Sequence, residues 1–365
     1  MIENNDSVIF WWPDSVFNDV HWKKDPGSIP LELKNLGYKV IIAVGKFHSS
    51  VRNKGIILFE TYQGKKNISI WNRLISVISI MKLMRKYSPK AIITLHATFE
   101  ALMFAIFVKI YFIFHKEKSP KMILKLDIGQ QFAKINNESS IRIIQRLLFS
   151  IFFNKIICES TCAYEEVLRP KPILRYKNKY LIIPNGFHNS TKNEIIFEKS
   201  ERYSRILSVG RISYQKGQDI LIRIFAKIRN KFPEWQLRIV GMLDNNQYLE
   251  ELKNEITDLK VGNSVKILTD LNDEDIIREY ESASIFSLLS RNEGFSIARV
   301  EAIHYGLPIV ITEAGCGIYF KNFGSLVCNI ENEDCIIRAL EALISNKDLR
   351  NEISDKQQSA IITWH

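Results

Sequence analysis

Short apolar runs alternate with longer amphipathic stretches along the whole chain, and this alternation predicts strands separated by helices. In the first half, strands are predicted at 8–12, 39–44, 91–95, 122–126, 155–158 and 180–183, with short candidates at 56–60 and 68–70. Helices are predicted at 29–36 and 75–87, and a loop with Pro13, Asp14, Pro26 and Gly27 is predicted after the first strand. Strands joined by helices favour a parallel sheet that is covered on both faces.

The same alternation restarts after a polar, strand-poor stretch. Its predicted strands are 205–209, 235–240, 265–268, 285–289, 309–311 and 325–327, and its predicted helices are 217–231, 248–259, 273–282, 297–305 and 333–345. We therefore predict an α/β protein of two Rossmann-like, doubly wound domains, residues 1–188 and 205–365, joined by a linker over 189–204. Two such domains would face each other across a cleft at the carboxyl ends of both sheets, where doubly wound folds bind ligands.

Composition is that of a folded soluble protein, with 46% hydrophobic and 25% charged residues. The five cysteines, at 158, 162, 316, 328 and 335, are odd in number and scattered, which fits a reducing cytoplasm. Cys158 and Cys162 could share a helix face, but no second pair with metal-ligand spacing accompanies them, so no zinc site is predicted. The first residues have no basic region before an apolar stretch, so no signal peptide is predicted.

Charge is distributed unevenly between the two halves. Residues 1–190 carry 28 Lys+Arg and 14 Asp+Glu, whereas residues 191–365 carry 22 and 26. A basic first half indicates an anionic partner. No helix-turn-helix signature, RNA-binding aromatic motif or zinc-finger spacing supports nucleic acid, so a membrane surface is the better interpretation.

Two apolar segments with basic flanks, 101–114 and 141–153, lie in the same basic half. Each is shorter than the ~20 residues that are needed to span a bilayer. Two interpretations stay open at this point. Both segments are buried helices that pack on a sheet, or they make an interfacial contact that dips partly into lipid.

The most informative chemistry lies in the second half, where Glu293 and Glu301 are eight positions apart. A strand-like run leads into Glu293, and Glu301 falls about a turn and a half inside a helix predicted to start near Ser296. Carboxylates accept hydrogen bonds from sugar hydroxyls, and the N–H groups of a helix's first turn suit phosphate. Two glutamates at this spacing are more often a helix cap and a solvated residue than a ligand site. The surrounding residues must therefore decide between these two interpretations.

A basic segment, Val209–Gly217, lies between a predicted strand and a predicted helix. Gly210 lets the backbone approach a ligand closely, and Arg211 and Lys216 place two positive charges at the helix entrance, which suits a diphosphate. The segment is neither a Walker loop nor the Gly-x-Gly-x-x-Gly of dinucleotide binders. Taken alone, it fits a solvated basic loop equally well.

Together these motifs carry a resemblance. The strings Ser290-Arg-Asn-Glu-Gly-Phe-Ser and Glu301-Ala-Ile-His-Tyr-Gly-Leu-Pro-Ile-Val-Ile-Thr follow the basic segment, as they do in the retaining glycosyltransferases of family 4, which this chain resembles from about Ile182 onward. The resemblance is weak before that point. It implies the GT-B fold, with an acceptor-binding N-terminal domain and a C-terminal domain that binds a nucleotide-sugar donor.

The resemblance also implies roles for individual residues. Arg211 and Lys216 would neutralise the leaving nucleoside diphosphate, Glu293 would bind the hydroxyls of the donor sugar, and Glu301 would bind the ribose. The donor site would be completed by Gly210, Gly294, Phe295 and Ser296, the last two offering backbone N–H groups. No metal or other cofactor is implied, because two cations and the helix dipole take its place.

Four further positions in the first half match the family less closely. A histidine near His96 often contacts the transferred sugar in that family, although a capping or core histidine fits as well. Asp127 is a candidate for the acceptor side, or a structural residue. Pro26-Gly27 resembles a degraded form of the family's glycine-rich acceptor loop, and Asn185-Gly186 matches a turn before the linker.

The chain departs from the family in two loops and at its end. Gly241 is followed by Met-Leu-Asp where the family commonly has Asp-Gly, and Glu313-Ala-Gly-Cys-Gly-Ile stands where glycines precede an acidic residue. These differences put local donor contacts in question rather than the fold. Family members usually continue with a helix that crosses back to the N-terminal domain, and here that helix is expected to be truncated at its start.

The predicted function is that of a retaining glycosyltransferase. It would move a sugar from a nucleotide-diphosphate donor to a lipid-linked or polysaccharide acceptor in surface-glycan biosynthesis, as a cytoplasmic protein peripheral on the inner face of the cell membrane. Two alternatives are a nucleotide-sugar epimerase on the same fold and a non-catalytic scaffold homologue. A glycosidase, with two carboxylates roughly 5–9.5 Å apart, does not need Arg211 and Lys216.

Overall fold

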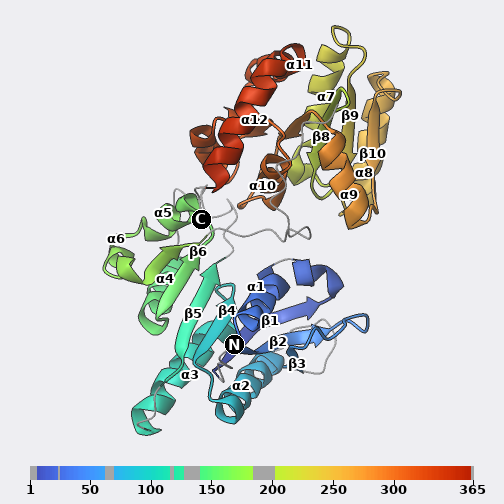
Figure 1. Cartoon of the computed structure of the whole chain (residues 1–365). Helices are drawn as coiled ribbons and strands as arrows, with labels where there is room; N and C mark the ends of the chain where they lie inside the picture. The colour runs from blue at the N-terminus through green and yellow to red at the C-terminus, as the bar shows by residue number, and fades with distance from the viewer. Residues whose placement is uncertain are drawn as a thin grey trace. The chain divides into compact units, whose positions relative to one another are not determined.

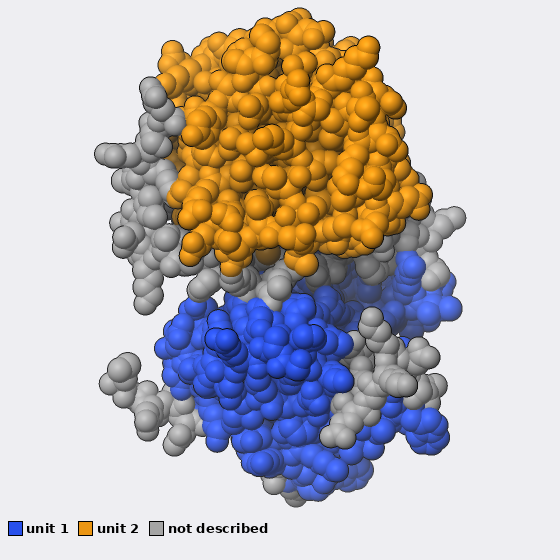
Figure 2. Space-filling model, turned by 90° about the vertical axis from the view of Figure 1, so that its right-hand side faces the viewer, with its two compact units in different colours: residues 1–188 blue, residues 189–365 orange. Residues whose placement is uncertain are grey.

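The computed structural model describes residues 6–23, 25–61, 70–115, 119–126, 140–183 and 202–362. Its contacts divide the chain into two compact units, residues 1–188 and 189–365, which Figure 2 colours separately. Each unit is an α/β domain with its own parallel sheet (Figure 1), as the alternation of the sequence predicted. The linker predicted over 189–204 lies for the most part outside the described residues.

The sheet of unit 1 has seven strands in the order β3-β2-β1-β4-β5-β6-β7. Their bounds are β1 Ser7–Phe17, β2 Lys39–Phe47, β3 Ile57–Glu60, β4 Ala91–Leu95, β5 Lys121–Leu126, β6 Lys155–Cys158 and β7 Tyr180–Ile182. Because the strand order reverses between β1 and β4, the carboxyl ends of these two strands flank the crevice in which such sheets bind ligands.

The loop predicted at Pro13 and Asp14 was wrong, because β1 continues to Phe17. The pairing register with β2 shifts between Trp12 and Val16, so these residues form an irregularity inside the strand. A proline is tolerated at such a bulge because its missing N–H leaves no ladder hydrogen bond unmade.

Three long helices, α2 Ile70–Tyr87, α3 Phe99–His115 and α4 Ser140–Phe152, share one hydrophobic cluster with the sheet of unit 1. On the other face of the sheet, residues of β1, β2 and α1 Asp25–Asn35 form a separate hydrophobic cluster. The short helices η1 Asp19–Lys23, α5 Thr161–Leu168, α6 Lys171–Leu174 and η3 Lys177–Lys179 were not predicted. Of the strand candidate at 68–70, only Ile70 is described, as the first residue of α2.

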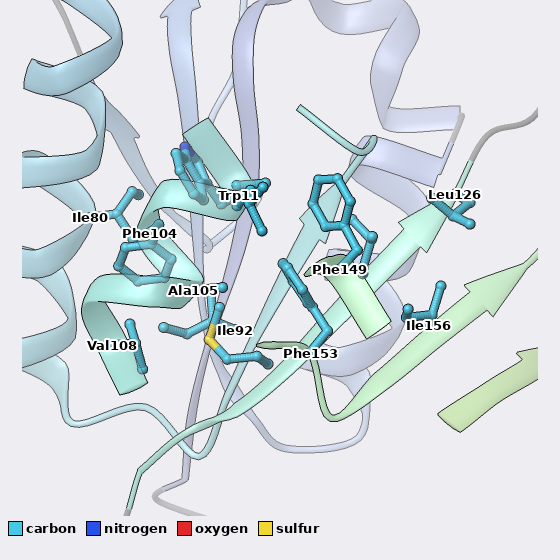
Figure 3. Packing of buried hydrophobic residues seen from close by; sticks show 14 of the residues in the cluster. Trp11, Ile80, Ile92, Phe104, Ala105, Val108, Leu126, Phe149, Phe153 and Ile156 are labelled. Carbon is cyan, nitrogen blue, oxygen red and sulfur yellow. The ribbon is translucent and has the colours of Figure 1, made fainter. Parts of the chain in front are cut away.

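The larger core of unit 1 lies between its sheet and these three helices (Figure 3). Trp11 of β1 is fully buried, and its ring lies 5.3 Å from that of Phe104 of α3 in an edge-to-face arrangement. Phe149 of α4 joins the same cluster. The apolar segments 101–114 and 141–153 therefore do contain buried helix faces, as one of the two interpretations held. None of the helices in the described ranges is both long and apolar enough to cross a bilayer.

The sheet of unit 2 has six strands in the order β10-β9-β8-β11-β12-β13. Their bounds are β8 Arg205–Val209, β9 Gln236–Val240, β10 Val265–Leu268, β11 Ile285–Leu288, β12 Ile309–Thr312 and β13 Leu326–Cys328. The helices are α7 Gln218–Arg229, α8 Asn246–Asp258, α9 Asp273–Ser282, α10 Ile297–His304, α11 Glu333–Ser345 and α12 Lys347–Ile362, with short helical turns at η4 Tyr214–Lys216 and η5 Gly317–Phe323. Each predicted element of this half is present within two residues of its predicted bounds, whereas η4, η5 and α12 were not predicted.

Two of the five cysteines form a disulfide, contrary to what their scattered pattern indicated. Cys328 ends β13 and Cys335 lies in the first turn of α11, and their Cα atoms are 5.9 Å apart. The connection from β13 to α11 turns back on itself and brings the two residues together across seven positions. Cys158 and Cys316 are buried and are not part of a disulfide.

Candidate functional site

Two loops of unit 2 meet at the point where its strand order reverses. The basic loop, residues 210–217, follows β8, and the acidic loop, residues 289–296, follows β11. The two strands are parallel neighbours, with Ile206 opposite Ile285, so both loops leave the sheet at its carboxyl edge. This is the topological switch point of the domain, where open α/β sheets bind their ligands.

The two loops are joined by a buried ion pair. Lys216 Nζ lies 2.5 Å from Glu293 Oε1, and the two side chains are only 16% and 5% exposed. Ser290 Oγ donates a second hydrogen bond to the same carboxylate oxygen, over 3.1 Å. The structure therefore brings together two of the predicted site residues that are 77 positions apart in the sequence.

Arg211 is oriented differently from Lys216. Its guanidinium lies 3.4 Å from Asp244, a residue of the loop after β9, and its side chain is 59% exposed. The pair of cations predicted to hold a diphosphate is therefore divided, with Lys216 buried on Glu293 and Arg211 paired at the surface. Asp244 belongs to the segment in which the sequence departs from the resembled family.

Glu301 lies inside α10, whose first turn follows the acidic loop. The helix begins after Ser296, which has φ 63° and ψ 87° in the left-handed region. A residue with a side chain held there costs on the order of 1–3 kcal/mol, and such strain is found most often at ligand sites. Tyr280 of α9 donates a hydrogen bond of 2.9 Å to Glu301 Oε2.

The surroundings of Glu301 change its ionisation. Burial raises the pKa of the Glu301 carboxyl, and the hydrogen bond from Tyr280 opposes that rise. Burial and the neighbouring Glu301 raise the pKa of Tyr280 well above its usual value, so Tyr280 remains a donor at neutral pH. Tyr280 thus donates to one carboxylate oxygen of Glu301, Oε2, and the contact does not involve the other oxygen, Oε1.

Arg299 is a site residue that the sequence did not single out. It is fully buried, and its guanidinium donates to the carbonyl oxygen of Ala314 over 3.0 Å. It also lies 5.9 Å from the ring centroid of Phe320. Burial lowers the pKa of Arg299, and the charge of Glu293 opposes this. Arg299 therefore fastens α10 to the loop after β12 and places a positive charge behind Glu293.

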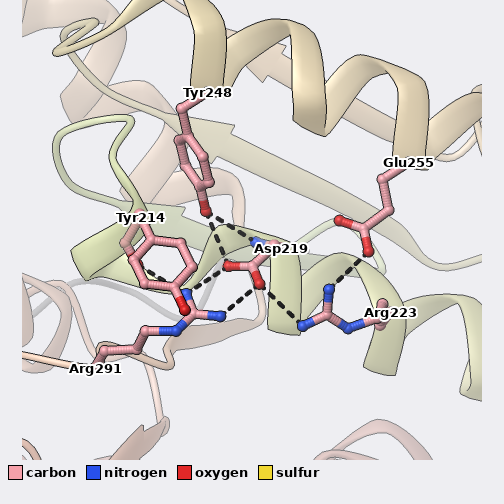
Figure 4. Close-up of polar contacts among 6 residues, drawn as sticks. All are labelled: Tyr214, Asp219, Arg223, Tyr248, Glu255 and Arg291. Carbon is pink, nitrogen blue, oxygen red and sulfur yellow. Dashed lines mark hydrogen bonds and ion pairs between the residues drawn. The ribbon is translucent and has the colours of Figure 1, made fainter.

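A second ion-pair cluster holds the acidic loop against α7 (Figure 4). Arg291 donates two hydrogen bonds to Asp219, of 2.7 and 2.6 Å, and its guanidinium carbon lies 3.7 Å from the ring centroid of Tyr214. Tyr248 and Arg223 donate to the same carboxylate, both over 2.9 Å. Burial alone would raise the pKa of Asp219, but these hydrogen bonds and the charge of Arg291 lower it to about 2.

Close backbone contact between the loops depends on two glycines. At Gly217, with φ +67°, an added Cβ would lie 2.0 Å from the carbonyl oxygen of Leu289. At Gly315, with φ +63°, it would lie 2.2 Å from the carbonyl oxygen of Gly294. Positive φ and this proximity together require glycine at both positions.

The remaining predicted donor residues lie on the same two loops. Gly210 donates its backbone N–H to Val240 over 3.0 Å, and Gly294 accepts a hydrogen bond of 3.4 Å from Cys316. Phe295, within the acidic loop, is buried at 2% exposed. The ligand contacts expected of Gly210, Gly294, Phe295 and Ser296 stay predictions, as does independence of a metal.

His96 lies in unit 1, at the carboxyl end of β4, with φ 63°. It borders a cavity of about 310 Å³, which we call the β4 cavity. The cavity is lined by His96, Ala97, Leu124, Leu126, Arg142, Gln145, Arg146, Phe149, Ile156, Val167 and Tyr180. Its lining thus combines apolar side chains with two arginines of α4, next to the switch point of unit 1.

The other first-half positions are resolved only in part. Pro26 and Gly27 lie in the first turn of α1 rather than before it, and an added Cβ at Gly27 would lie 2.5 Å from the backbone of His21. Lys125, at the end of β5, forms an ion pair with Asp25 at the start of the same helix. Asp127, Asn185 and Gly186 lie outside the described residues.

The two α/β units have the architecture of the GT-B fold. Residues 189–360, in the second half of the chain, match the model of the family Glycosyl transferases group 1. The match contains both loops of the site, with Lys216, Glu293 and Glu301.

Three similar proteins illustrate the relationship. An uncharacterized glycosyltransferase of Haemophilus influenzae is 35% identical over 199 residues, which is 53% of this chain and 52% of that protein, so the chain spans about half the length of this relative. WaaG, a glycosyltransferase involved in lipopolysaccharide biosynthesis, has a TM-score of 0.66 at 13% identity, over 96% of this chain and 94% of its own. Anabaena HepE in complex with UDP has a TM-score of 0.68 at 16% identity, over 97% and 94%.

Gly217→Ala should lower the free energy of unfolding by about 2 kcal/mol or more. Its backbone is in the left-handed region, which disfavours a Cβ, and the added Cβ would also collide with the acidic loop. Urea denaturation of the purified protein measures this. Gly262→Ala is the matched control, since the atom nearest to its added Cβ is 3.8 Å away. Equal losses in the two variants would contradict the contact argued for Gly217.

Asp219→Asn should destabilise the protein by about 2 kcal/mol at neutral pH, since the native pKa is about 2 against an ordinary 3.8. A carboxyl with a lowered native pKa stabilises the fold above its unfolded pKa. That contribution is lost as the pH falls from about 4 towards 2. Denaturation midpoints of wild type and variant should therefore converge over this range. Exposed Asp258→Asn should leave the wild-type pH profile unchanged.

Proposed function

We propose that the protein is a retaining glycosyltransferase that moves a sugar from a nucleoside-diphosphate donor to an acceptor. The observation that supports this best is the buried Lys216–Glu293 pair at the switch point of unit 2. The ammonium of Lys216 and the carboxylate of Glu293 lie 2.5 Å apart. The ammonium can bind a phosphate and the carboxylate can accept hydrogen bonds from hydroxyls, so the pair suits a ligand whose phosphate and sugar are adjacent. The family resemblance implies the same roles, with Lys216 on the leaving diphosphate and Glu293 on the hydroxyls of the donor sugar.

Lys216 would act on the leaving group. Its ammonium has three donors, of which one is used on Glu293, and the others can bind oxygens of the terminal phosphate. Negative charge grows on the diphosphate as the glycosidic bond of the donor breaks, so a cation held in place beforehand stabilises the transition state. Arg211 would leave Asp244 and bind the diphosphate from the solvent side.

The two glutamates would divide the donor between them. Glu293 would accept hydrogen bonds from hydroxyls of the transferred sugar, with the buried guanidinium of Arg299 behind it. Glu301 would accept hydrogen bonds from the ribose, with Tyr280 holding one of its oxygens. In this arrangement no metal takes part, because Lys216, Arg211 and the first turn of α10 meet the phosphate charge.

Unit 1 would bind the acceptor. The β4 cavity supports a lipid-linked acceptor, because its apolar walls suit a hydrocarbon chain and the guanidinium groups of Arg142 and Arg146 suit a phosphate. His96 would lie at the sugar end of that acceptor. WaaG, named for its part in lipopolysaccharide biosynthesis, has the same fold, and this supports a role in surface-glycan assembly. The protein would then be peripheral on the cytoplasmic face of the membrane.

Glu293→Gln and Lys216→Met should each lower kcat by about 10²–10³, because each removes a charge that the transition state uses. Transfer from radiolabelled nucleotide sugars to membrane lipid extracts measures this, with UDP, GDP and ADP sugars tested in turn. The double variant should fold more stably than Glu293→Gln alone, since Lys216 is then no longer left as a buried cation without its partner. Exposed Lys266→Met and Glu331→Gln are the matched controls.

The outcome separates three functions. Full activity in both single variants would refute the assignment of the site. Conversion of the nucleotide sugar without an acceptor would identify an epimerase. Nucleotide binding without any turnover would identify a scaffold homologue.

Tyr280→Phe should raise the pH at which nucleoside diphosphate binding is lost. The hydrogen bond from Tyr280 lowers the pKa of Glu301, so its removal lets burial raise that pKa further. The carboxyl then protonates at a higher pH and no longer accepts hydrogen bonds from ribose. Isothermal titration from pH 5 to 8 measures the shift, and an unchanged midpoint would exclude Glu301 as the ribose ligand.

A further inference from the structure

Two helices of unit 1, α2 and α3, run parallel and side by side on the outside of its sheet (Figure 1). Near their N-terminal ends, Arg73 Nε lies 3.0 Å from Glu100 Oε1. Near their C-terminal ends, the guanidinium carbon of Arg85 lies 5.1 Å from the ring centroid of Tyr111. These contacts fix which side of each helix faces its neighbour. The sides that face the sheet belong to the core of unit 1.

The sides that face away from the sheet are also apolar. We call them the outer apolar face, which consists of Trp71, Leu74, Ile75 and Ile78 on α2 and Phe107, Ile110, Ile113 and Phe114 on α3. The spacing of three and four positions makes one continuous stripe on each helix. Trp71, Ile113 and Phe114 are 72%, 73% and 77% exposed. A helix at the surface of a soluble protein normally carries polar residues on this side.

The charge around the outer apolar face is almost entirely positive. The helices α2, α3 and α4 contain seven Lys and Arg, four of them on α2, and one acidic residue, Glu100. Glu100 is buried and paired with Arg73, so it contributes no negative charge to the surface. Lys82 and Lys86 are exposed and continue the stripe of α2 beyond Ile78.

We propose that the outer apolar face docks on an anionic lipid surface. The inference rests on the proposed function, because this is the surface from which a lipid-linked acceptor would be taken. A bilayer satisfies both observations, since apolar side chains enter the boundary of head groups and acyl chains while exposed Lys and Arg attract anionic head groups. A second copy of the chain does not satisfy both observations, because contact between two such faces would bring the cations of one close to the cations of the other.

The position of the side chains indicates how the contact is made. Ile113 and Phe114 end α3 and are the most exposed apolar residues of the face, so they enter the lipid deepest. Trp71 begins α2, and an indole ring prefers the interface between head groups and acyl chains. Lys82 and Lys86 then lie along α2 at the level of the head groups. The two helices would lie in the plane of the interface without crossing it.

Vesicle flotation tests the proposal on the full chain without any donor. Vesicles of phosphatidylcholine alone are compared with vesicles that contain about one third phosphatidylglycerol, for which each cation near the surface should add about fivefold in binding. Ile113→Gln with Phe114→Gln should lower binding to the anionic vesicles by more than tenfold. Lys82→Glu with Lys86→Glu should lower it by at least about 25-fold and remove the preference for anionic lipid.

Two control variants carry the same substitutions elsewhere. Leu36→Gln changes a residue that is 69% exposed, after α1 on the opposite face of the sheet, and Lys266→Glu changes an exposed lysine of unit 2. Both should bind vesicles as the wild type does. All substituted positions are exposed, and thermal melting of each variant verifies that it is folded.

Three results would overturn the proposal. One is a wild-type protein that does not float with anionic vesicles, and another is a loss in the control variants as large as in the face variants. The third is a dimer in sedimentation that the Ile113 and Phe114 substitutions disperse, which would assign the face to a second copy. Flotation without sugar transfer would refute the proposed function and leave this inference standing, and transfer to lipid without flotation would do the reverse.

Discussion

The buried ion pair between Lys216 and Glu293 is the contact on which the architecture of unit 2 depends. Removing two charges from water costs several kcal/mol for each ion, and only close, well-placed partners offset that cost. The pair therefore requires that the loops after β8 and β11 keep a fixed position relative to each other. The glycine at 217 allows their backbones to touch, and Arg291 on Asp219 holds the loops together from the other side.

The same constraint fixes the positions of Lys216 and Glu293 in the site. A charged group that is already desolvated and fixed does not need to reorganise when charge develops on a leaving group. Arg211 is the exception, because its partner Asp244 is half exposed and the pair is open to solvent. A surface pair of this kind contributes little stability, so Arg211 can exchange partners at small cost. The site thus combines one fixed cation with one that can move.

Local patterns predicted most of the fold, and they singled out Lys216 and Glu293 as candidate site residues but not the contacts that hold them. The helices α9 and α11 have the predicted bounds because caps and amphipathic spacing are local signals. Lys216 and Glu293 were found because each lies in a recognisable string beside a strand. Arg291 and Asp219 are 72 positions apart, and no short pattern joins them. Arg299 was missed for a related reason, since an arginine in an apolar helix turn reads as exposed until the partner carbonyl of Ala314 is known.

The interpretation of the apolar segments as buried helices is confirmed for one side of each helix, and the lipid contact stays a prediction for the other. A sequence that is apolar all around a helix predicts burial without saying by what. The sheet of unit 1 covers only one side of α2 and α3, and the described side chains on the other side are still apolar and surrounded by cations. The helices α2, α3 and α4 carry seven Lys and Arg and one acidic residue, so their positive charge and their exposed apolar side chains are two features that an anionic lipid surface would satisfy together.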